Sequence, residues 1–138
     1  MGFELYLQCF ASGRPAGIPR SAVRALFPVV ENESEPNNWR VRYDSTDMCT
    51  VGVTSAEGDP TRLHSICIYK PCGDICLFVA ILSVLRMGSV ILYFPGVPTP
   101  LVASESVVVD LPKELVDSMG RPRCVQSAQE IVDIMRRA

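Results

Sequence analysis

The sequence has few of the residues and motifs on which common catalytic and cofactor sites depend. Its 138 residues include a single histidine, and they contain no G-x-G-x-x-G or P-loop sequence, no G-x-S-x-G and no H-E-x-x-H. A Cys–His catalytic pair would have to be built on that one histidine. Nucleotide-cofactor and hydrolase classes therefore have no support, and we expect no cofactor.

An excess of basic residues is also lacking. Thirteen Lys and Arg residues stand against fifteen Asp and Glu, for a formal net charge of −2. Nucleic acids and anionic membranes are bound through clustered Lys and Arg, so neither is expected as a partner. The first residues, MGFELYLQCF, lack the basic start of a signal peptide, and the apolar run at 75–85 is too short to span a bilayer. We expect a soluble, cytoplasmic protein.

The chain has six cysteines but no C-x-x-C pair, which is the usual element of a zinc site. Buried thiols behave as small apolar groups, and we expect all six to be reduced. The spacing His64-x-x-Cys67-x4-Cys72-x3-Cys76 offers zinc-binding residue types. However, residues 64 and 67 are an odd number apart on a predicted strand and should face opposite sides, so no metal is expected.

What the sequence does contain is a globular core, with 48% hydrophobic and 20% charged residues. Its most informative stretch is 71–96. Asp74 is a predicted helix N-cap, Gly88 is placed where a left-handed residue commonly ends a helix, and the helix between them is apolar nearly all round. Such a helix must be covered on more than one side. The run 90–94 predicts a strand buried on both faces.

Alternating apolar residues predict further strands at 3–9 (from Phe3), 39–44, 49–53 and 63–69, with Ser45 in the turn of a 39–54 hairpin. Short strands are predicted at 101–103 and 107–109, and a polar loop at 55–62. Helices are predicted near 18–27, at 112–119 and after the capping-box residues Ser127 and Glu130. We expect one α+β domain, 1–138, with a mixed sheet of about five or six strands and helices mainly on one face. Residues 63–94 should form a right-handed βαβ unit with parallel strands.

The acidic residues are concentrated in the middle of the chain. Turns at alternate ends of a strand meander separate Asp44 and Asp47 from the loops 31–38 and 55–62, so these two loops should meet at one edge of the sheet. The preferred function is a non-catalytic protein-binding module, of antagonist or immunity type, that covers a basic protein partner. Its predicted partner-binding residues are Glu31, Glu33, Glu35, Trp39, Glu57 and Asp59.

The alternative is a small enzyme or ligand-binding domain with a pocket near 94–105. Ligands of open α/β sheets bind beyond the carboxyl ends of strands, where Tyr93 and the proline-rich loop lie. Cys72 stands at a helix N-terminus, which favours a thiolate, although the charge of Asp74 opposes it. The predicted pocket residues are Cys72, Asp74, Tyr93 and Glu105.

Overall fold

The computed structural model describes residues 4–44 and 46–137, so Phe3 and Ser45, which the sequence places in a strand and a turn, lie outside the described residues. The main path of the sheet follows the order β4-β5-β6-β1-β7-β8-β9. Its strands, with two short ones that pair beside it, are β1 (Glu4–Ala11), β2 (Arg14–Pro15), β3 (Ile18–Pro19), β4 (Asn38–Arg42), β5 (Met48–Ala56), β6 (Asp59–Tyr69), β7 (Val90–Tyr93), β8 (Leu101–Val102) and β9 (Arg123–Cys124).

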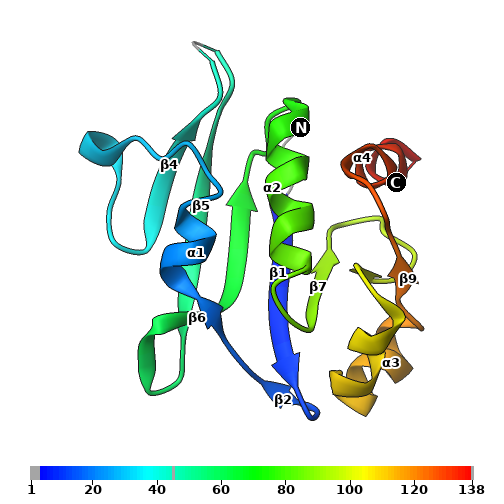
Figure 1. Ribbon diagram of the computed structural model, residues 1–138. Coiled ribbons are helices and arrows are strands. Elements are labelled where there is room, and N and C mark those ends of the chain that lie inside the picture. The colour runs from blue at the N-terminus through cyan, green and yellow to red at the C-terminus, as the bar shows by residue number, and fades with distance from the viewer. Residues whose placement is uncertain (1–3, 45, 138) are drawn as a thin grey trace.

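The helices lie mainly on one face of this sheet. Helices packed on a mixed sheet are an α+β arrangement, so the predicted class is confirmed. They are α1 (Arg20–Arg24), α2 (Ile75–Leu85), α3 (Lys113–Met119) and α4 (Ala128–Arg137), with 3-10 helices η1 (Glu31–Glu33) and η2 (Glu105–Asp110). Figure 1 shows α2 in front of the central strands with α1 and α4 on either side. Helices α1, α2 and α4 enclose the main core. On the other face, η2 and α3 cover a small second core of Phe10, Ile91, Val102, Val107 and Leu111.

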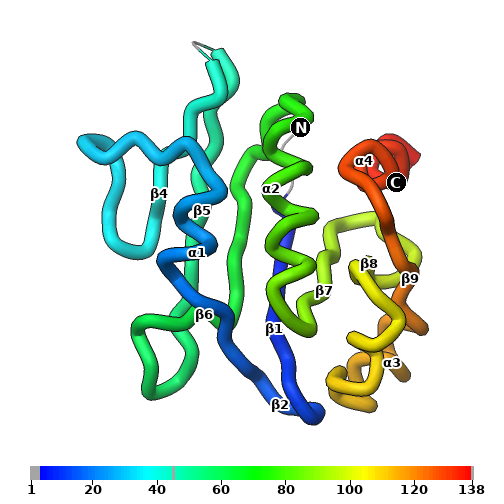
Figure 2. The backbone as a smooth tube through the Cα atoms, viewed as in Figure 1, coloured from blue at the N-terminus to red at the C-terminus, as the bar shows by residue number. Residues whose placement is uncertain are grey.

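The sheet is mixed, as expected, but it has nine strands rather than five or six. Four of them, β2, β3, β8 and β9, are only two residues long. Within the predicted 63–94 unit, β6 and β7 run parallel to each other, yet they are not neighbours. Strand β1 lies between them and pairs antiparallel with both. The tube in Figure 2 shows α2 running past β1 to join the two.

Helix α2 begins as the sequence predicts. Asp74 is its N-cap, and the Asp74 carboxylate accepts a hydrogen bond of 2.8 Å from the backbone N–H of Cys76. The helix ends at Leu85, however, and Gly88 is not left-handed. A Cβ at Gly88 would come within 3.3 Å of the Ile18 side chain, so glycine packs closely there without displacing Ile18. None of the helices that the structure describes is long and apolar enough to cross a membrane.

Two further predictions need correction. Residues 107–109 form part of the 3-10 helix η2 rather than a strand, with Val109 82% exposed. The predicted loop 55–62 is mostly strand, because β5 extends to Ala56 and β6 begins at Asp59, which leaves a two-residue turn with Gly58 at φ +77°. The α4 cap is close to prediction: Ser127 Oγ accepts from the Glu130 N–H, while the Glu130 carboxylate accepts from Gln126 rather than from Ser127.

Truncating the buried side of α2 should destabilise the protein far more than truncating its outer side. Leu85 is 1% exposed and Val79 is 52% exposed. Leu85→Ala should lower the free energy of unfolding by about 2–5 kcal/mol through lost burial and a cavity. Val79→Ala should change it by less than about 1 kcal/mol. Urea unfolding of the two variants measures this, and equal midpoint shifts would contradict the packing described.

Candidate functional site

The two acidic segments 31–38 and 55–62, hereafter the loop pair, are each anchored to the sheet. Residues 28–30 run along the outer edge of β4, where the Val30 N–H donates to the Arg40 carbonyl at 2.8 Å and the Arg42 N–H to the Pro28 carbonyl at 3.1 Å. The 31–38 segment then turns back through reciprocal Glu35–Asn38 backbone hydrogen bonds. Both ends of this segment are therefore held by β pairing, and the outer edge of β4 is covered.

Arg20 joins the two halves of the loop pair. It is the first residue of α1, directly after Pro19 of β3, which pairs with β6. Its guanidinium donates to the Pro36 carbonyl at 3.0 Å and to Asn37 Oδ1 at 3.2 Å in one segment. In the other it donates to Ser55 Oγ at 2.7 Å and to the Pro60 carbonyl at 2.8 Å. The two segments meet as expected, and one side chain with four hydrogen bonds links them.

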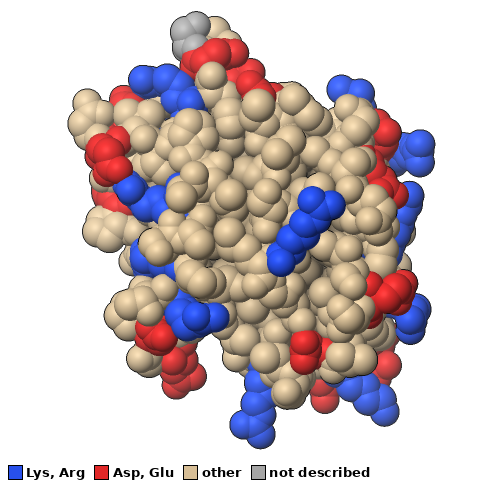
Figure 3. All heavy atoms as spheres, in the orientation of Figure 1, with Lys and Arg blue, Asp and Glu red and all other residues tan. Residues whose placement is uncertain are grey.

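The acidic residues of the loop pair are not equivalent. Glu31 forms an ion pair with Arg24 at 2.7 Å, which lowers the pKa of Glu31, and Glu33 forms one with Arg42 at 3.1 Å. In the described part of the chain, the exposed Glu35 and Glu57 have no ion-pair partner within 4 Å. Figure 3 accordingly shows acidic and basic side chains interspersed on the β4 side, whereas the surface over α2 has little charge.

Trp39 is a structural residue rather than a contact surface. Its side chain is 1% exposed, its indole N–H donates to the Pro36 carbonyl at 3.1 Å, and the Arg24 guanidinium lies 5.8 Å from the ring centroid. The sequence places Trp39 among the partner-binding residues because it follows the acidic loop. In the structure the buried Trp39 side chain holds the 31–38 segment through its hydrogen bond to Pro36. A shallow hollow of about 420 Å³ is lined by Trp39, Arg24 and Glu35, among others.

A second acidic cluster lies apart from the loop pair, as the meander argument expects. The carboxylates of Asp44 and Asp47 are joined there by that of Asp74, with their oxygens within 4.8 Å of one another. Burial, followed by the charges of Asp44 and Asp74, raises the pKa of Asp47. Of the described residues, these three form the one group arranged to share a metal ion. Structural roles account for two of them, because Asp44 accepts three hydrogen bonds within its turn and Asp74 caps α2.

A hollow of about 100 Å³ lies at Gly96 and Pro98, within the predicted 94–105 region, but none of the four predicted pocket residues lines it. Cys72 packs against the main core, whereas Tyr93 packs against the second core on the opposite face of the sheet. The Tyr93 ring stacks on that of Tyr6, with 5.1 Å between the ring centroids. Glu105 is held elsewhere by Arg121 at 3.0 Å. Burial raises the pKa of Cys72, which opposes the thiolate that its position near a helix N-terminus suggests.

The His64, Cys67, Cys72 and Cys76 side chains do not form a metal-binding group either. A bulge places one extra residue in β6 at His64, because Thr54 pairs with Ser65 and Ser55 with Leu63. Strict alternation therefore fails at His64, and the parity argument from the sequence does not hold there. Distance separates His64 from Cys72 and Cys76 instead, because the strand from His64 to Tyr69 spans about 17 Å at about 3.3 Å per residue.

Comparisons of the chain with models of protein families, with curated proteins and with solved structures find no match. The geometry of the chain's own residues is thus the basis for assigning a function.

Replacing Arg20 by lysine should loosen the loop pair. A lysine ammonium cannot reproduce a planar fork that reaches four acceptors, so Arg20→Lys should lower the free energy of unfolding by about 1–2 kcal/mol. Arg14→Lys, at an exposed arginine whose side chain has no hydrogen bond within the described residues, is the matched control and should be neutral. Equal thermal unfolding curves for the two variants would show that the four hydrogen bonds contribute nothing.

Thiol reactivity should follow exposure first, because the pKa of all six thiols is raised, that of Cys76 by the neighbouring Asp74 carboxylate. Cys76 is exposed, whereas burial holds Cys9 out of contact with solvent and raises the pKa of Cys49 to about 12. Because the thiolate is the reactive form, iodoacetamide at pH 8 should modify Cys76 first and Cys49 among the last. Mass spectrometry of time points gives the order, and all six cysteines should react in denaturant without reductant. Rapid labelling of Cys49, or fewer than six reactive thiols in denaturant, would contradict the structure.

Proposed function

We propose that the protein is a non-catalytic protein-binding module, of antagonist or immunity type, which engages a basic protein partner through the loop pair. The observation that carries this proposal is the Arg20 guanidinium, which hydrogen-bonds to both segments. A surface held in one conformation before binding loses less conformational entropy when a partner arrives. Four hydrogen bonds from one side chain are consistent with such a preorganised surface.

The charges of the loop pair define the chemistry of the partner. Arg24 and Arg42 neutralise Glu31 and Glu33, so the attraction for a basic partner comes chiefly from Glu35 and Glu57. Asp59 adds a third carboxylate, whose pKa is lowered by hydrogen bonds from Thr61 and which therefore stays ionised. Exposed carboxylates of this kind accelerate encounter with a basic surface more than they stabilise the fold.

Catalysis is the weaker proposal for this chain. It requires titratable side chains that converge on one reacting centre. Of the predicted pocket residues, Cys72 and Tyr93 instead lie on opposite faces of the sheet, and Glu105 is paired with Arg121. The loop pair gathers residues from distant parts of the chain and is more open to a partner than the Asp44, Asp47 and Asp74 cluster, two of whose members have structural roles.

Charge reversal at the two unpaired glutamates tests the function. The Glu35→Lys, Glu57→Lys double variant should capture less of the partner from a native lysate, and at low salt it should associate with the recovered partner about tenfold more slowly or worse. The Glu114→Lys, Asp117→Lys variant carries the same change of net charge on exposed residues of α3 and should behave as wild type.

Salt gives the second readout. The wild-type association rate should fall steeply as salt is raised, and that of the double variant should not. Thermal unfolding of both variants should match wild type, because exposed charges contribute little to stability. Equal association rates for wild type and double variant, or no captured protein, would overturn the proposed function.

A further inference from the structure

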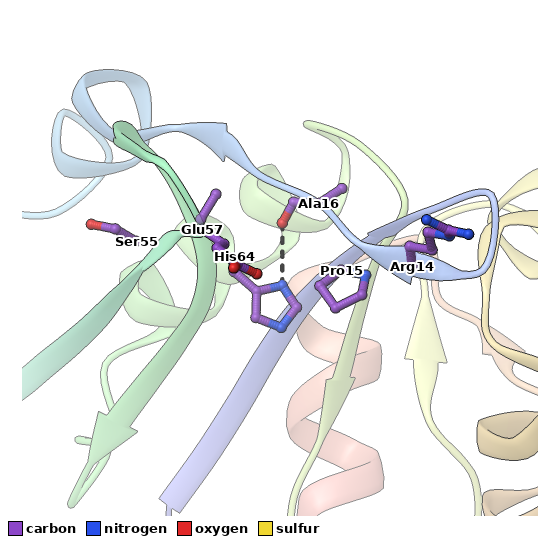
Figure 4. A pocket seen from close by; sticks show the side chains of 7 residues that line it. Arg14, Pro15, Ala16, Ser55, Glu57 and His64 are labelled. Carbon is purple, nitrogen blue, oxygen red and sulfur yellow. Dashed lines mark hydrogen bonds between the residues drawn. The ribbon is translucent and has the colours of Figure 1, made fainter.

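A hollow adjoins the loop pair and shares the 55–57 tip with it. Its volume is about 710 Å³, and the residues that line it come from the 14–16 segment, the end of β5 and the bulge of β6. Figure 4 shows this arrangement, with His64 between Glu57 on one side and Pro15 and Arg14 on the other. The principal lining residues are Arg14, Pro15, Ala16, Ala56, Glu57 and His64.

The His64 ring is held in one orientation and one tautomer. Its Nδ1 lies 3.1 Å from the Cys9 carbonyl oxygen and 3.2 Å from that of Ala16. Carbonyl oxygens only accept hydrogen bonds, so Nδ1 must carry the proton, and Nε2 of the neutral ring is left as an acceptor. The edge-to-face contact with Phe10, at 5.8 Å between centroids, fixes the ring from the other side. His64 therefore contributes an oriented acceptor to the hollow.

Glu57 contributes the second acceptor. Its carboxylate is exposed and has no ion-pair partner among the described residues. In Figure 4 it lies on the His64 side of the hollow, whereas Arg14 lies at the opposite end. The lining also includes the apolar side chains of Pro15, Ala16 and Ala56, together with Ser55, whose hydroxyl accepts a hydrogen bond from Arg20. Two acceptors, one of them charged, beside the apolar side chains of Pro15, Ala16 and Ala56 match a cationic donor on an aliphatic stem.

We propose that this hollow receives an arginine side chain of the partner protein, an inference that rests on the proposed function. The guanidinium would donate to the Glu57 carboxylate and to His64 Nε2, with its methylene stem against Pro15 and Ala56. A planar group with five donors in a fork can meet two separate acceptors at once, which a single ammonium does less well. Arginine is also enriched among the residues that dominate binding at protein interfaces. The hollow is thus the anchor point of the loop-pair surface.

The experiment is a nuclear magnetic resonance titration of the full chain with N-acetylarginine amide. The backbone amides of Ala56 and Glu57 and the His64 ring signals should shift in a saturable manner. N-acetylcitrulline amide has the same shape without the charge and should bind at least fivefold more weakly. Glu57→Gln should weaken arginine binding by a similar factor, and Glu114→Gln, on α3, should leave it unchanged.

The inference is overturned if the arginine probe causes no saturable shift, if citrulline binds equally well, or if Glu57→Gln has no effect. The two proposals fail separately. A protein captured through Glu35 and Glu57, with no arginine binding in the hollow, overturns this inference alone. Arginine binding that depends on Glu57, with no captured protein, supports the site and overturns the proposed function.

Discussion

Burial of α2 is the constraint on which the rest of the structure depends. Seven of its eleven residues are buried, so the helix needs apolar cover on more than one side. The sheet supplies one side, and α4 supplies another through Ile131 and Ile134 of the same core. Because β6 and β7 are joined by this helix, β1 can lie between them and pair with both. The centre of the molecule is therefore an apolar core, and the polar side chains available for binding lie at the surface.

The loop pair depends on that frame through short contacts. Strand β3 pairs with β6 and is followed directly by α1. Arg20, the first residue of α1, therefore lies beside the β5–β6 turn. Residues 28–30 cover the edge of β4 and lead into the 31–38 segment, which also reaches Arg20. The Arg62 guanidinium adds a hydrogen bond of 2.6 Å to the Gly17 carbonyl, just before β3. Strand pairing thus brings the two acidic segments to one place, and Arg20 adds side-chain hydrogen bonds to both of them.

Much of the fold was predictable because its signals are local. The cap at Asp74, the apolar run of α2 and the buried strand β7 are each visible within a few residues. Strands of two residues have no periodicity to detect, so β2, β3 and β9 could not be predicted, whereas the apolar pair of β8 lies within the strand predicted at 101–103. Three consecutive valines at 107–109 resemble a strand. They form a 3-10 helix in which Val107 is buried and Asp110, at its end, accepts hydrogen bonds from the Ser12 N–H and the Ser89 hydroxyl.

The candidate site was predictable only in outline. The meander placed the two acidic segments at one edge, but no pattern around Ile18 and Pro19 indicates that Arg20 joins them. The ion pairs that neutralise Glu31 and Glu33 depend on tertiary pairing for the same reason. The bulge at His64 is likewise invisible in a strand that otherwise alternates, and it is this bulge that gives the hollow its histidine.

The central claim is that the loop pair has one fixed conformation before any partner binds. The most direct measurement is the set of backbone 15N order parameters of the free protein at Glu35, Asn37, Gly58 and Asp59. The structure predicts values near those of a rigid backbone, about 0.85, equal to those of β5 and β6. Values below about 0.6 at these positions, with rigid strands beside them, would contradict the account.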